Sequence, residues 1–405
     1  MTLNRVNMYS FRIENIIHAT ILLLFLLTPI FSIKESLALI FGGIVNNSTA
    51  FTPVYIKIIK DLGFALMILI SFLGVLKQKS INKTTLFVLF YIAIILSFAF
   101  LYKDDLLIFL VGIRWLTPIV LMSFLIPYIK QDLLNKIATL LGFLFIFHFL
   151  FQIAQLFFSD GWFGLNALGL SIRNPGMFFM PSTSAFFTIM VLFFAMFYLQ
   201  SGLLRNFIFI FSPISIFLTA SGSGIAVYIV IMFLYLLKQK YFKLLPMFGL
   251  VLFFIIIYTI EDISGRAGLL EESFGIRIKI FFDIINESKL LPQSFGYGTS
   301  VGYLISSKYG LYFNMISTET TYTSIIVNLG LISFFLTLII VLLSLIVAWL
   351  NNNKELLIFI MIFGLFSATT SIFEAYPMNM LFAILMAYYL RNYKREKYET
   401  LNNPQ

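Results

Sequence analysis

Residues 321–349 read TYTSIIVNLGLISFFLTLIIVLLSLIVAW, an apolar run without a single charged side chain. A helix of about 20 residues crosses the hydrocarbon core of a bilayer, so this run is long enough to span a membrane and to tilt. In lipid, every backbone N–H and C=O group must find its partner within the segment, which makes such a run a helix. The stretch therefore predicts an α-helical membrane protein.

Comparable apolar runs recur along the whole chain. Of its 405 residues, 60% are hydrophobic and 11% are charged, whereas a soluble domain carries about 25% charged residues. We therefore expect an all-α polytopic membrane protein with about twelve transmembrane helices, forming a single integral membrane domain over residues 1–405. The expected spans lie near 15–33, 54–76, 84–101, 106–128, 135–158, 181–200, 205–220, 223–237, 242–260, 321–349, 355–372 and 377–391.

The distribution of Lys and Arg predicts how these spans are oriented. Basic residues gather in alternate connections and in both terminal segments, and short basic connections remain in the cytoplasm. The basic set comprises Arg5, Arg12, Lys77, Lys79, Lys83, Lys130, Lys136, Arg205, Lys238, Lys240, Lys243, Lys354 and the tail from Arg391 to Lys397. The connections predicted outside are 34–53, 102–105, 159–180, 221–222, 261–320 and 369–376. The net charge of +9 is thereby assigned to anchoring against anionic lipid, and no nucleic-acid partner is expected.

The composition also excludes several kinds of chemistry. The chain has no cysteine, which rules out disulfides, thiolate nucleophiles and cysteine metal sites. Its two histidines, His18 and His148, lie far apart in the sequence, so a histidine-rich metal centre is not expected. We predict no metal site and no cofactor.

The outside connection 261–320 is the longest polar stretch of the chain. Within it, Phe274, Ile278, Phe281, Phe282 and Ile285 are spaced as one face of a helix of about 15 residues that Pro292 ends. Such a helix is too short to span a membrane and is suited to lie at the interface. Arg277 falls at the edge of this apolar face. There its guanidinium can bind a lipid-borne phosphate, or it can simply reach the interface as an anchor, and spacing alone does not separate these alternatives.

Two further features of this connection are candidates for a site. Gly296, Tyr297 and Gly298 form a pattern that permits a tight turn and close backbone approach to a ligand, although most such patterns are only turns. Glu319 precedes the span 321–349 and stands near Tyr322. A carboxylate there can act as a general base or orient a hydroxyl, and the competing interpretation is a cap residue at the helix start.

Polar residues inside or beside the apolar runs are the remaining candidates. Arg114 lies well inside the span 106–128, where an arginine needs a partner in the bundle interior or must reach the interface. We interpret His148 as a hydrogen-bonded interior residue rather than a catalyst. Arg173, followed by Asn-Pro-Gly, is either a second anion-binding arginine or part of a turn that contacts lipid headgroups. Residues 221–224, Ser-Gly-Ser-Gly, predict a tight turn between two helices.

Three segments share a fixed order along the chain. They are RNPGMFFMP at 173–181, the stretch from Gly275 and Arg277 to Gly296-Tyr297-Gly298, and Glu319 with Tyr322 and Asn328–Leu331. Together they resemble the superfamily of O-antigen ligases and Wzy-type O-antigen polymerases over roughly residues 170–340. The third segment is similar in spacing to the ligases' histidine and the span that follows it. Glu319 stands at the histidine position, which favours a polymerase.

The resemblance implies a metal-independent glycosyltransferase that joins undecaprenyl-pyrophosphate-linked oligosaccharide repeats at the periplasmic face of a bacterial inner membrane. It implies that Arg277, with Arg173 or Arg266, holds the lipid diphosphate, because arginine binds phosphate in a bidentate way and keeps its charge. Glu319 would act on the acceptor hydroxyl. The other expected substrate-binding residues are Arg114, Gly296, Tyr297, Gly298 and Tyr322. Expected partners are the lipid-linked substrate, membrane lipid, and a chain-length regulator and flippase of the same pathway.

Two alternatives stay open from the sequence. A ligase would transfer the finished polymer to lipid A-core. A lipid-linked oligosaccharide flippase would explain the number of spans and Arg114, but it would leave the long outside connection 261–320 without a role.

Overall fold

The computed structural model of the protein describes residues 2–41, 53–78, 81–103, 105–158, 174–178, 180–238, 279–299 and 320–402. Four predicted site residues lie outside the described residues, namely Arg173, Arg266, Arg277 and Glu319. The predicted span 242–260 and most of the predicted connections 159–180 and 261–320 lie outside them as well.

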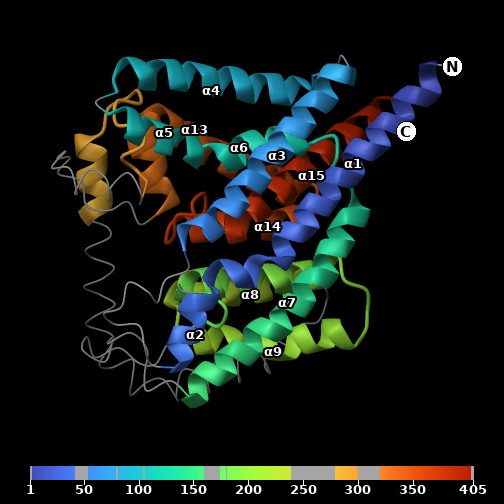
Figure 1. Ribbon diagram of the computed structural model, residues 1–405, viewed down its shortest axis with the longest axis vertical. Helices are drawn as coiled ribbons and strands as arrows, with labels where there is room; N and C mark the ends of the chain where they lie inside the picture. Colours follow the sequence, from blue (N-terminus) through green and yellow to red (C-terminus); the bar gives the residue numbers. More distant parts are fainter. Residues whose placement is uncertain are drawn as a thin grey trace.

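In the described part of the chain every regular element is a helix, and there is no strand (Figure 1). The elements are α1 (Thr2–Leu26), the 3-10 helix η1 (Thr28–Ser32), α2 (Ile33–Phe41), α3 (Val54–Gln78), α4 (Lys83–Leu101), α5 (Leu106–Trp115), α6 (Thr117–Leu125), α7 (Gln131–Phe158), α8 (Pro181–Phe197), α9 (Leu203–Thr219), α10 (Gly222–Lys238), α13 (Thr321–Leu350), α14 (Lys354–Ser367) and α15 (Met378–Asn402). Residues 279–287 form a further helical stretch.

Several described helices are suited to a membrane. Five helical stretches are long and apolar enough to cross one: Ile58–Leu76, Lys83–Leu101, Leu106–Leu125, Gln131–Phe157 and Thr321–Leu350. A sixth arises if Ile13–Leu26 and Thr28–Leu37, which are bent by 42° relative to each other, form one broken span. The predicted all-α class is confirmed, and these helices are compatible with a polytopic membrane protein. The figure of about twelve spans stays a prediction.

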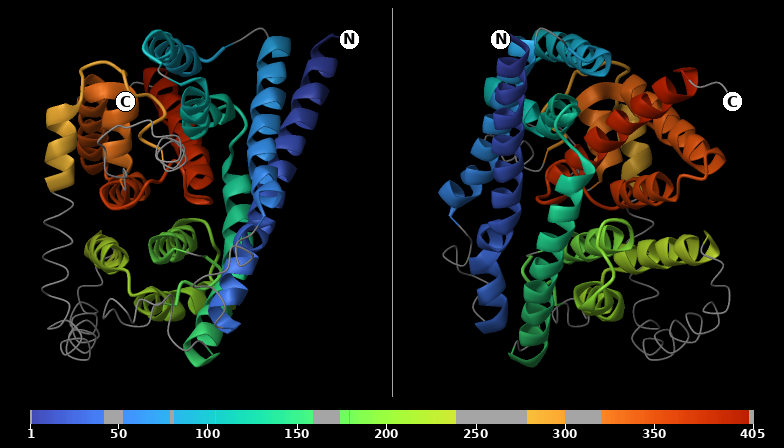
Figure 2. Two further views of the ribbon diagram at one scale, coloured as in Figure 1. Left: turned by 60° about the vertical axis from the view of Figure 1, so that its left-hand side comes forward. Right: turned by 90° about the vertical axis from the view of Figure 1, so that its right-hand side faces the viewer.

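α8 is the centre of the larger hydrophobic core. It packs against α7, α9, α10, α14 and α15, and its Phe186, Phe187, Phe193 and Phe194 are fully buried. Figure 2 shows α8, α9 and α10 as one group and α13, α14 and α15 as another, with the long helices α1, α3 and α7 alongside. A helix that is apolar on every face must be surrounded, and α8 is surrounded by protein.

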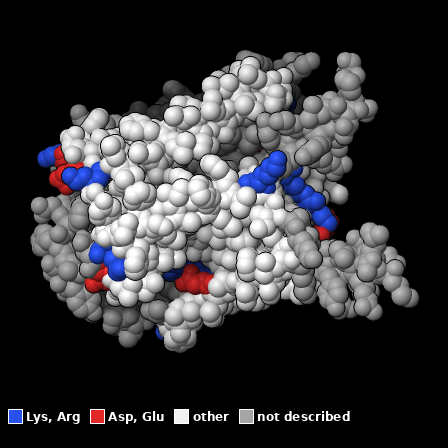
Figure 3. Space-filling model, turned by 90° about the horizontal axis from the view of Figure 1, so that it is seen from above, with Lys and Arg blue, Asp and Glu red and all other residues white. Residues whose placement is uncertain are grey.

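The outer surface is apolar over wide areas. On α4, Phe87 is 67% exposed and Phe90 is 65% exposed. Figure 3 shows a face on which described charged side chains form only small groups among uncharged residues. Exposed apolar faces of this extent suit contact with lipid.

Two predicted spans are less regular than their sequences indicate. The predicted span 106–128 consists of α5 and α6, which meet at Leu116, and Pro118 stands in the first turn of α6. α13 is kinked at Gly330, where φ is +80°. The N–H groups after this kink turn to another segment, since Leu331 N donates to the carbonyl of Lys289 at 3.1 Å. The middle of the outside connection 261–320 thus bonds directly to the interior of a predicted span.

The predicted interfacial helix contacts the protein through a different face. In its described part, residues 279–287, Ile284 is 3% exposed and packs in the smaller core cluster with α4, α5 and α13, whereas Phe282 is 57% exposed. The prediction directed one apolar face, with Phe281, Phe282 and Ile285, to the membrane surface; in the described part Phe282 is exposed, whereas Phe281 and Ile285 pack with Ile284 against the protein. Tertiary contact with α13 selects the face that includes Phe281, Ile284 and Ile285.

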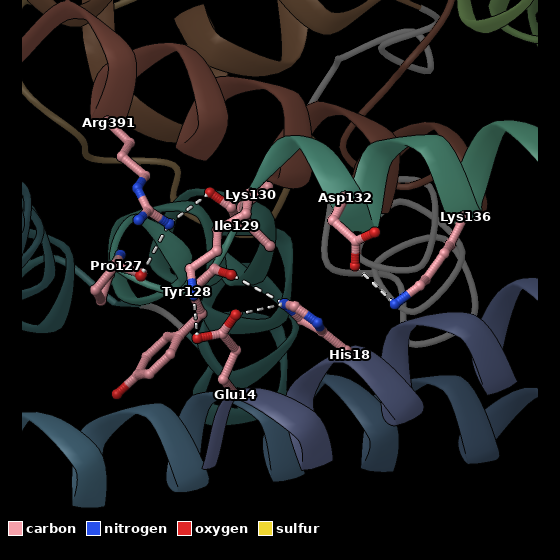
Figure 4. Close-up of polar contacts among 9 residues, drawn as sticks. All are labelled: Glu14, His18, Pro127, Tyr128, Ile129, Lys130, Asp132, Lys136 and Arg391. Carbon is pink, nitrogen blue, oxygen red and sulfur yellow. Dashed lines mark hydrogen bonds and ion pairs between the residues drawn. The ribbon is translucent and has the colours of Figure 1, made fainter. Parts of the chain in front are cut away.

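The predicted cytoplasmic connections contact one another. Lys130 Nζ pairs with Glu14 at 2.7 Å, and His18 Nε2 bonds to the carbonyl of Tyr128 at 3.0 Å. Arg391 Nη1 donates to the carbonyls of Pro127 at 3.1 Å and Ile129 at 2.9 Å (Figure 4). The middle of α1 and the middle of α15 are thereby bonded to the same connection, between α6 and α7.

The predicted outside connections form a separate network. Asn174 N donates to Leu218 O at 2.9 Å, beside the α9–α10 turn. Ser32 Oγ donates to Met177 O at 2.5 Å. Thr321 Oγ1 donates to Thr370 O at 2.8 Å. The alternation of inside and outside connections stays a prediction.

Candidate functional site

The Gly296-Tyr297-Gly298 turn is held by one buried asparagine. Asn328 Oδ1 of α13 accepts from the backbone N–H groups of Gly296 and Gly298, both at 3.0 Å. Gly296 has a φ of +94°, and a Cβ there would lie 2.0 Å from the carbonyl oxygen of Ile108. The turn therefore needs glycine for both its backbone angle and its close approach to α5.

The same turn packs on the helix that carries Arg114. A Cβ at Gly112 would lie 2.5 Å from the ring of Phe295, so the two segments meet with no room for a side chain. Thr299 Oγ1 donates to Gly296 O at 2.8 Å, which closes the turn. Thr299 and Arg114 line one cavity, so the structure brings two of the sequence-predicted features together.

Arg114 has the partner that its position predicted. Its Nη2 atom lies 2.9 Å from Asp61 Oδ2 and 3.2 Å from Asp61 Oδ1, across the interface of α5 and α3. The side chain of Arg114 is 49% exposed and that of Asp61 is 34% exposed. The expected partner is confirmed, but the pair borders an open cavity and is not enclosed in the interior. A lone carboxylate within the apolar run 54–76 was the available signal for Asp61.

The cavity has a volume of about 170 Å³ and is built from α3, α5, α6, the turn 296–299 and residues near the start of α15. It combines four charged side chains with hydroxyl, amide and aromatic groups. Its lining residues are Lys60, Asp61, Phe64, Val111, Arg114, Trp115, Thr117, Pro118, Thr299, Phe373, Glu374 and Asn379.

Trp115 and Phe373 form the aromatic wall of this cavity. Their ring centroids lie 5.1 Å apart in an edge-to-face arrangement. Trp115 is 3% exposed, and its buried Nε1 has no hydrogen-bond partner among the described residues. Sequence analysis missed both residues, because an aromatic side chain in an apolar run reads as core.

The α14–α15 connection, residues 368–377, joins this cavity to the start of α13. It contributes Phe373 and Glu374 to the lining. Thr321 Oγ1 donates to Thr370 O at 2.8 Å and accepts from Ile372 N at 2.8 Å. The residue two positions after Glu319 is therefore bonded to the segment that forms the cavity wall.

The cap at the start of α13 is Thr320. Its side chain accepts from Thr323 N at 3.1 Å, and Thr320 N donates back to Thr323 Oγ1 at 3.3 Å. The interpretation of Glu319 as the helix cap is therefore wrong. Tyr322 donates its hydroxyl to Gly364 O of α14 at 3.1 Å and is not among the residues that line the cavity.

The segment after Arg173 is fixed by polar side chains of α7. Gln155 bonds to both the N–H and the carbonyl of Gly176, at 2.7 Å and 2.8 Å. Gln152 donates to Asn174 O at 3.1 Å. A Cβ at Gly176, whose φ is +63°, would lie 2.5 Å from His148 Nδ1.

His148 is an interior residue, as predicted. It is fully buried, its Nδ1 accepts from Met177 N at 3.4 Å, and its Nε2 lies 3.1 Å from Ser184 Oγ. Because Nδ1 faces an N–H donor, the proton belongs on Nε2, which then donates to Ser184. This arrangement does not make His148 a base for that hydroxyl. A tight turn between two helices is confirmed, but it lies at Ala220 and Ser221, because α9 ends at Thr219 and α10 already begins at Gly222.

Tyr376 connects this segment to the cavity. Met177 bonds to Ser32 of η1, and Thr28 of η1 donates to the Tyr376 hydroxyl at 3.4 Å. Burial raises the pKa of the Tyr376 phenol far above its ordinary value, and the neutral hydroxyl donates to Leu24 O at 2.6 Å. Lys60 Nζ of the cavity lies 5.9 Å from the centre of the Tyr376 ring.

Comparison with protein-family models, curated proteins and solved structures finds no match for this chain. The resemblance described above therefore rests on the residues of the chain itself.

Proposed function

We propose that the protein is a polysaccharide polymerase that joins undecaprenyl-pyrophosphate-linked oligosaccharide repeats at the periplasmic face of a bacterial inner membrane. The observation that carries this proposal is the convergence of three motif segments. Thr299, at the end of the turn 296–299, lines the cavity at Arg114 together with Phe373 and Glu374 of the α14–α15 connection. Thr321, two residues after Glu319, bonds to Thr370 and Ile372 of that connection. The segment 174–177 reaches the same connection indirectly, because Met177 bonds to Ser32 of η1 and Thr28 of η1 bonds to Tyr376.

The reaction requires an anion-binding group and a group that acts on a hydroxyl. In our proposal, Arg277 with Arg173 or Arg266 binds the diphosphate of the donor lipid and stabilises the charge that develops on it. Glu319 takes the proton of the acceptor hydroxyl, whose oxygen forms the new bond to the anomeric carbon of the donor. The bond from that carbon to the phosphate oxygen breaks, and the lipid diphosphate leaves with the electron pair.

The packed core of the protein suits this reaction better than it suits transport. A flippase must carry a whole lipid-linked oligosaccharide through its centre, and here α8 fills the centre of the larger core with fully buried phenylalanines. A polymerase needs only a site at one membrane face. Its pathway partners would be the flippase that delivers the repeats and a regulator of chain length.

Deletion of the gene tests the proposal, with the lipopolysaccharide of the cell separated on a gel. A polymerase predicts a core that carries one repeat. A bare core with accumulated lipid-linked polymer would indicate a ligase, and absence of any periplasmic repeat would indicate a flippase. Complementation with Glu319→Gln should fail to restore polymer. Glu287→Gln changes another carboxylate of the same connection and should restore it.

A further inference from the structure

The cavity at Arg114 is balanced in charge. Its lining residues include two cations, Lys60 and Arg114, and two carboxylates, Asp61 and Glu374. Arg114 directs Nη2 at both oxygens of Asp61, so this side of its guanidinium is already satisfied. A diphosphate carries several negative charges and is bound best where cations are in excess. Binding it here would require Arg114 to leave Asp61 or the phosphate to approach two carboxylates.

The remaining lining groups suit a neutral ligand with many hydroxyls. Trp115 and Phe373 supply an aromatic wall against which the C–H face of a sugar ring can pack. Carboxylates accept hydrogen bonds from hydroxyls, and the guanidinium N–H groups that do not face Asp61 can donate to them.

The size and place of the cavity narrow the ligand further. A volume of about 170 Å³ has room for about one ring and not for an extended chain. One wall of the cavity is Phe373. Its neighbour Ile372 bonds to Thr321, and Thr321 lies two residues after Glu319 in the chain. A sugar held in the cavity would therefore lie close to the start of α13, where the proposed base precedes the helix.

We infer that this cavity is a sugar-binding subsite that seats the acceptor ring, and that the lipid diphosphate binds elsewhere, at arginines outside the cavity. That the bound ring belongs to the acceptor rests on the proposed function. The sugar site itself rests only on the residues that line the cavity. Asp61 is then a positioning residue, because it fixes the guanidinium of Arg114, and Trp115 is a specificity-determining wall.

The test measures binding of two probes to the purified full-length protein in lipid nanodiscs. The first probe is the cell's own oligosaccharide repeat, released from its lipid by mild acid. The second is inorganic pyrophosphate. Wild-type protein should bind the repeat in a saturable way, and pyrophosphate should not displace it. Trp115→Phe, which shortens the aromatic wall, and Asp61→Asn, which weakens the hold on Arg114, should each weaken binding of the repeat about tenfold.

Matched substitutions elsewhere provide the controls. Trp349→Phe changes a tryptophan that is 59% exposed on α13, and Asp132→Asn changes an aspartate that is paired with Lys136 at 2.7 Å far from the cavity. Both controls should keep wild-type affinity for the repeat. The two cavity substitutions should leave affinity for pyrophosphate unchanged.

Several results would overturn the inference. They are displacement of the repeat by pyrophosphate, absence of saturable binding to wild-type protein, and equal affinity of the cavity variants and the controls. Its failure is distinguishable from failure of the proposed function. If Trp115→Phe weakens sugar binding but gene deletion leaves the polymer intact, the sugar site stands and the polymerase does not. If deletion abolishes the polymer but the cavity variants bind normally, the polymerase stands and the subsite does not.

Discussion

Gly296→Ala should destabilise the protein strongly, for two reasons that the structure makes separable. An alanine would have to adopt a φ of +94°, and strain of this kind costs about 1–3 kcal/mol. Its Cβ would also lie 2.0 Å from Ile108 O and 2.7 Å from Ile108 C. Relieving this overlap moves the turn or α5, as overpacking does, at about 1–3 kcal/mol. The two effects together give about 2–6 kcal/mol.

Thermal unfolding in a single detergent, followed by intrinsic fluorescence, measures this loss. The matched control is Gly222→Ala, at the first residue of α10, where an added Cβ would meet nothing within 4 Å. Because alanine favours a helix over glycine by about 0.5–1 kcal/mol, the control should unfold at or slightly above the wild-type temperature. If Gly296→Ala unfolds together with the control, the turn does not pack on α5 as described, and the convergence on the cavity loses its basis.

Three further predictions concern the proposed site and its orientation. Glu319→Gln should lower polymer formation by about 10²–10⁴-fold in a turnover assay. Thr320→Val should instead lower the unfolding temperature, because it removes a helix cap worth about 1 kcal/mol. If both changes affect only stability, and to the same extent, the assigned roles are wrong. Arg277→Lys should remain strongly impaired in a gel assay of polymer length, because lysine keeps the charge but loses the planar pair of donors, and a normal ladder would make Arg277 an interfacial anchor. Single cysteines at Ser294 and Lys240 should be labelled and unlabelled, respectively, by a membrane-impermeant thiol reagent in whole cells, and the reverse pattern would refute the orientation.

Apolar runs predicted most of the described helices, because backbone hydrogen bonding in lipid leaves little choice of structure. They did not fix the number of spans. α8 is apolar on every side and lies within protein, while α4 is apolar and exposes Phe87 and Phe90. Protein and lipid both favour the same side chains, so hydropathy alone cannot separate a core helix from a lipid-facing one.

The candidate site was predictable only in part, for a similar reason. That Arg114 needs a partner follows from the cost of an isolated charge, but the choice of Asp61 depends on how α3 meets α5. The Gly296-Tyr297-Gly298 turn was visible in the sequence, whereas its dependence on Asn328 was not, since the two lie in different elements. The Trp115 and Phe373 wall had no local signal at all. Contacts between residues that only tertiary packing brings together cannot be predicted from the residues next to them in the sequence.

Arg391 has a consequence for the synthesis of this protein. The carbonyls of Pro127 and Ile129 receive their donor from a residue 264 and 262 positions further along the chain. During translation, these two carbonyls of the connection between α6 and α7 therefore cannot accept hydrogen bonds from Arg391 until the final helix has left the ribosome. A chain that stalls before this point lacks this contact at residues 127–129. The last helix thus completes a contact whose other side lies in the first third of the sequence. We expect a membrane protease to remove nascent chains that lack this helix.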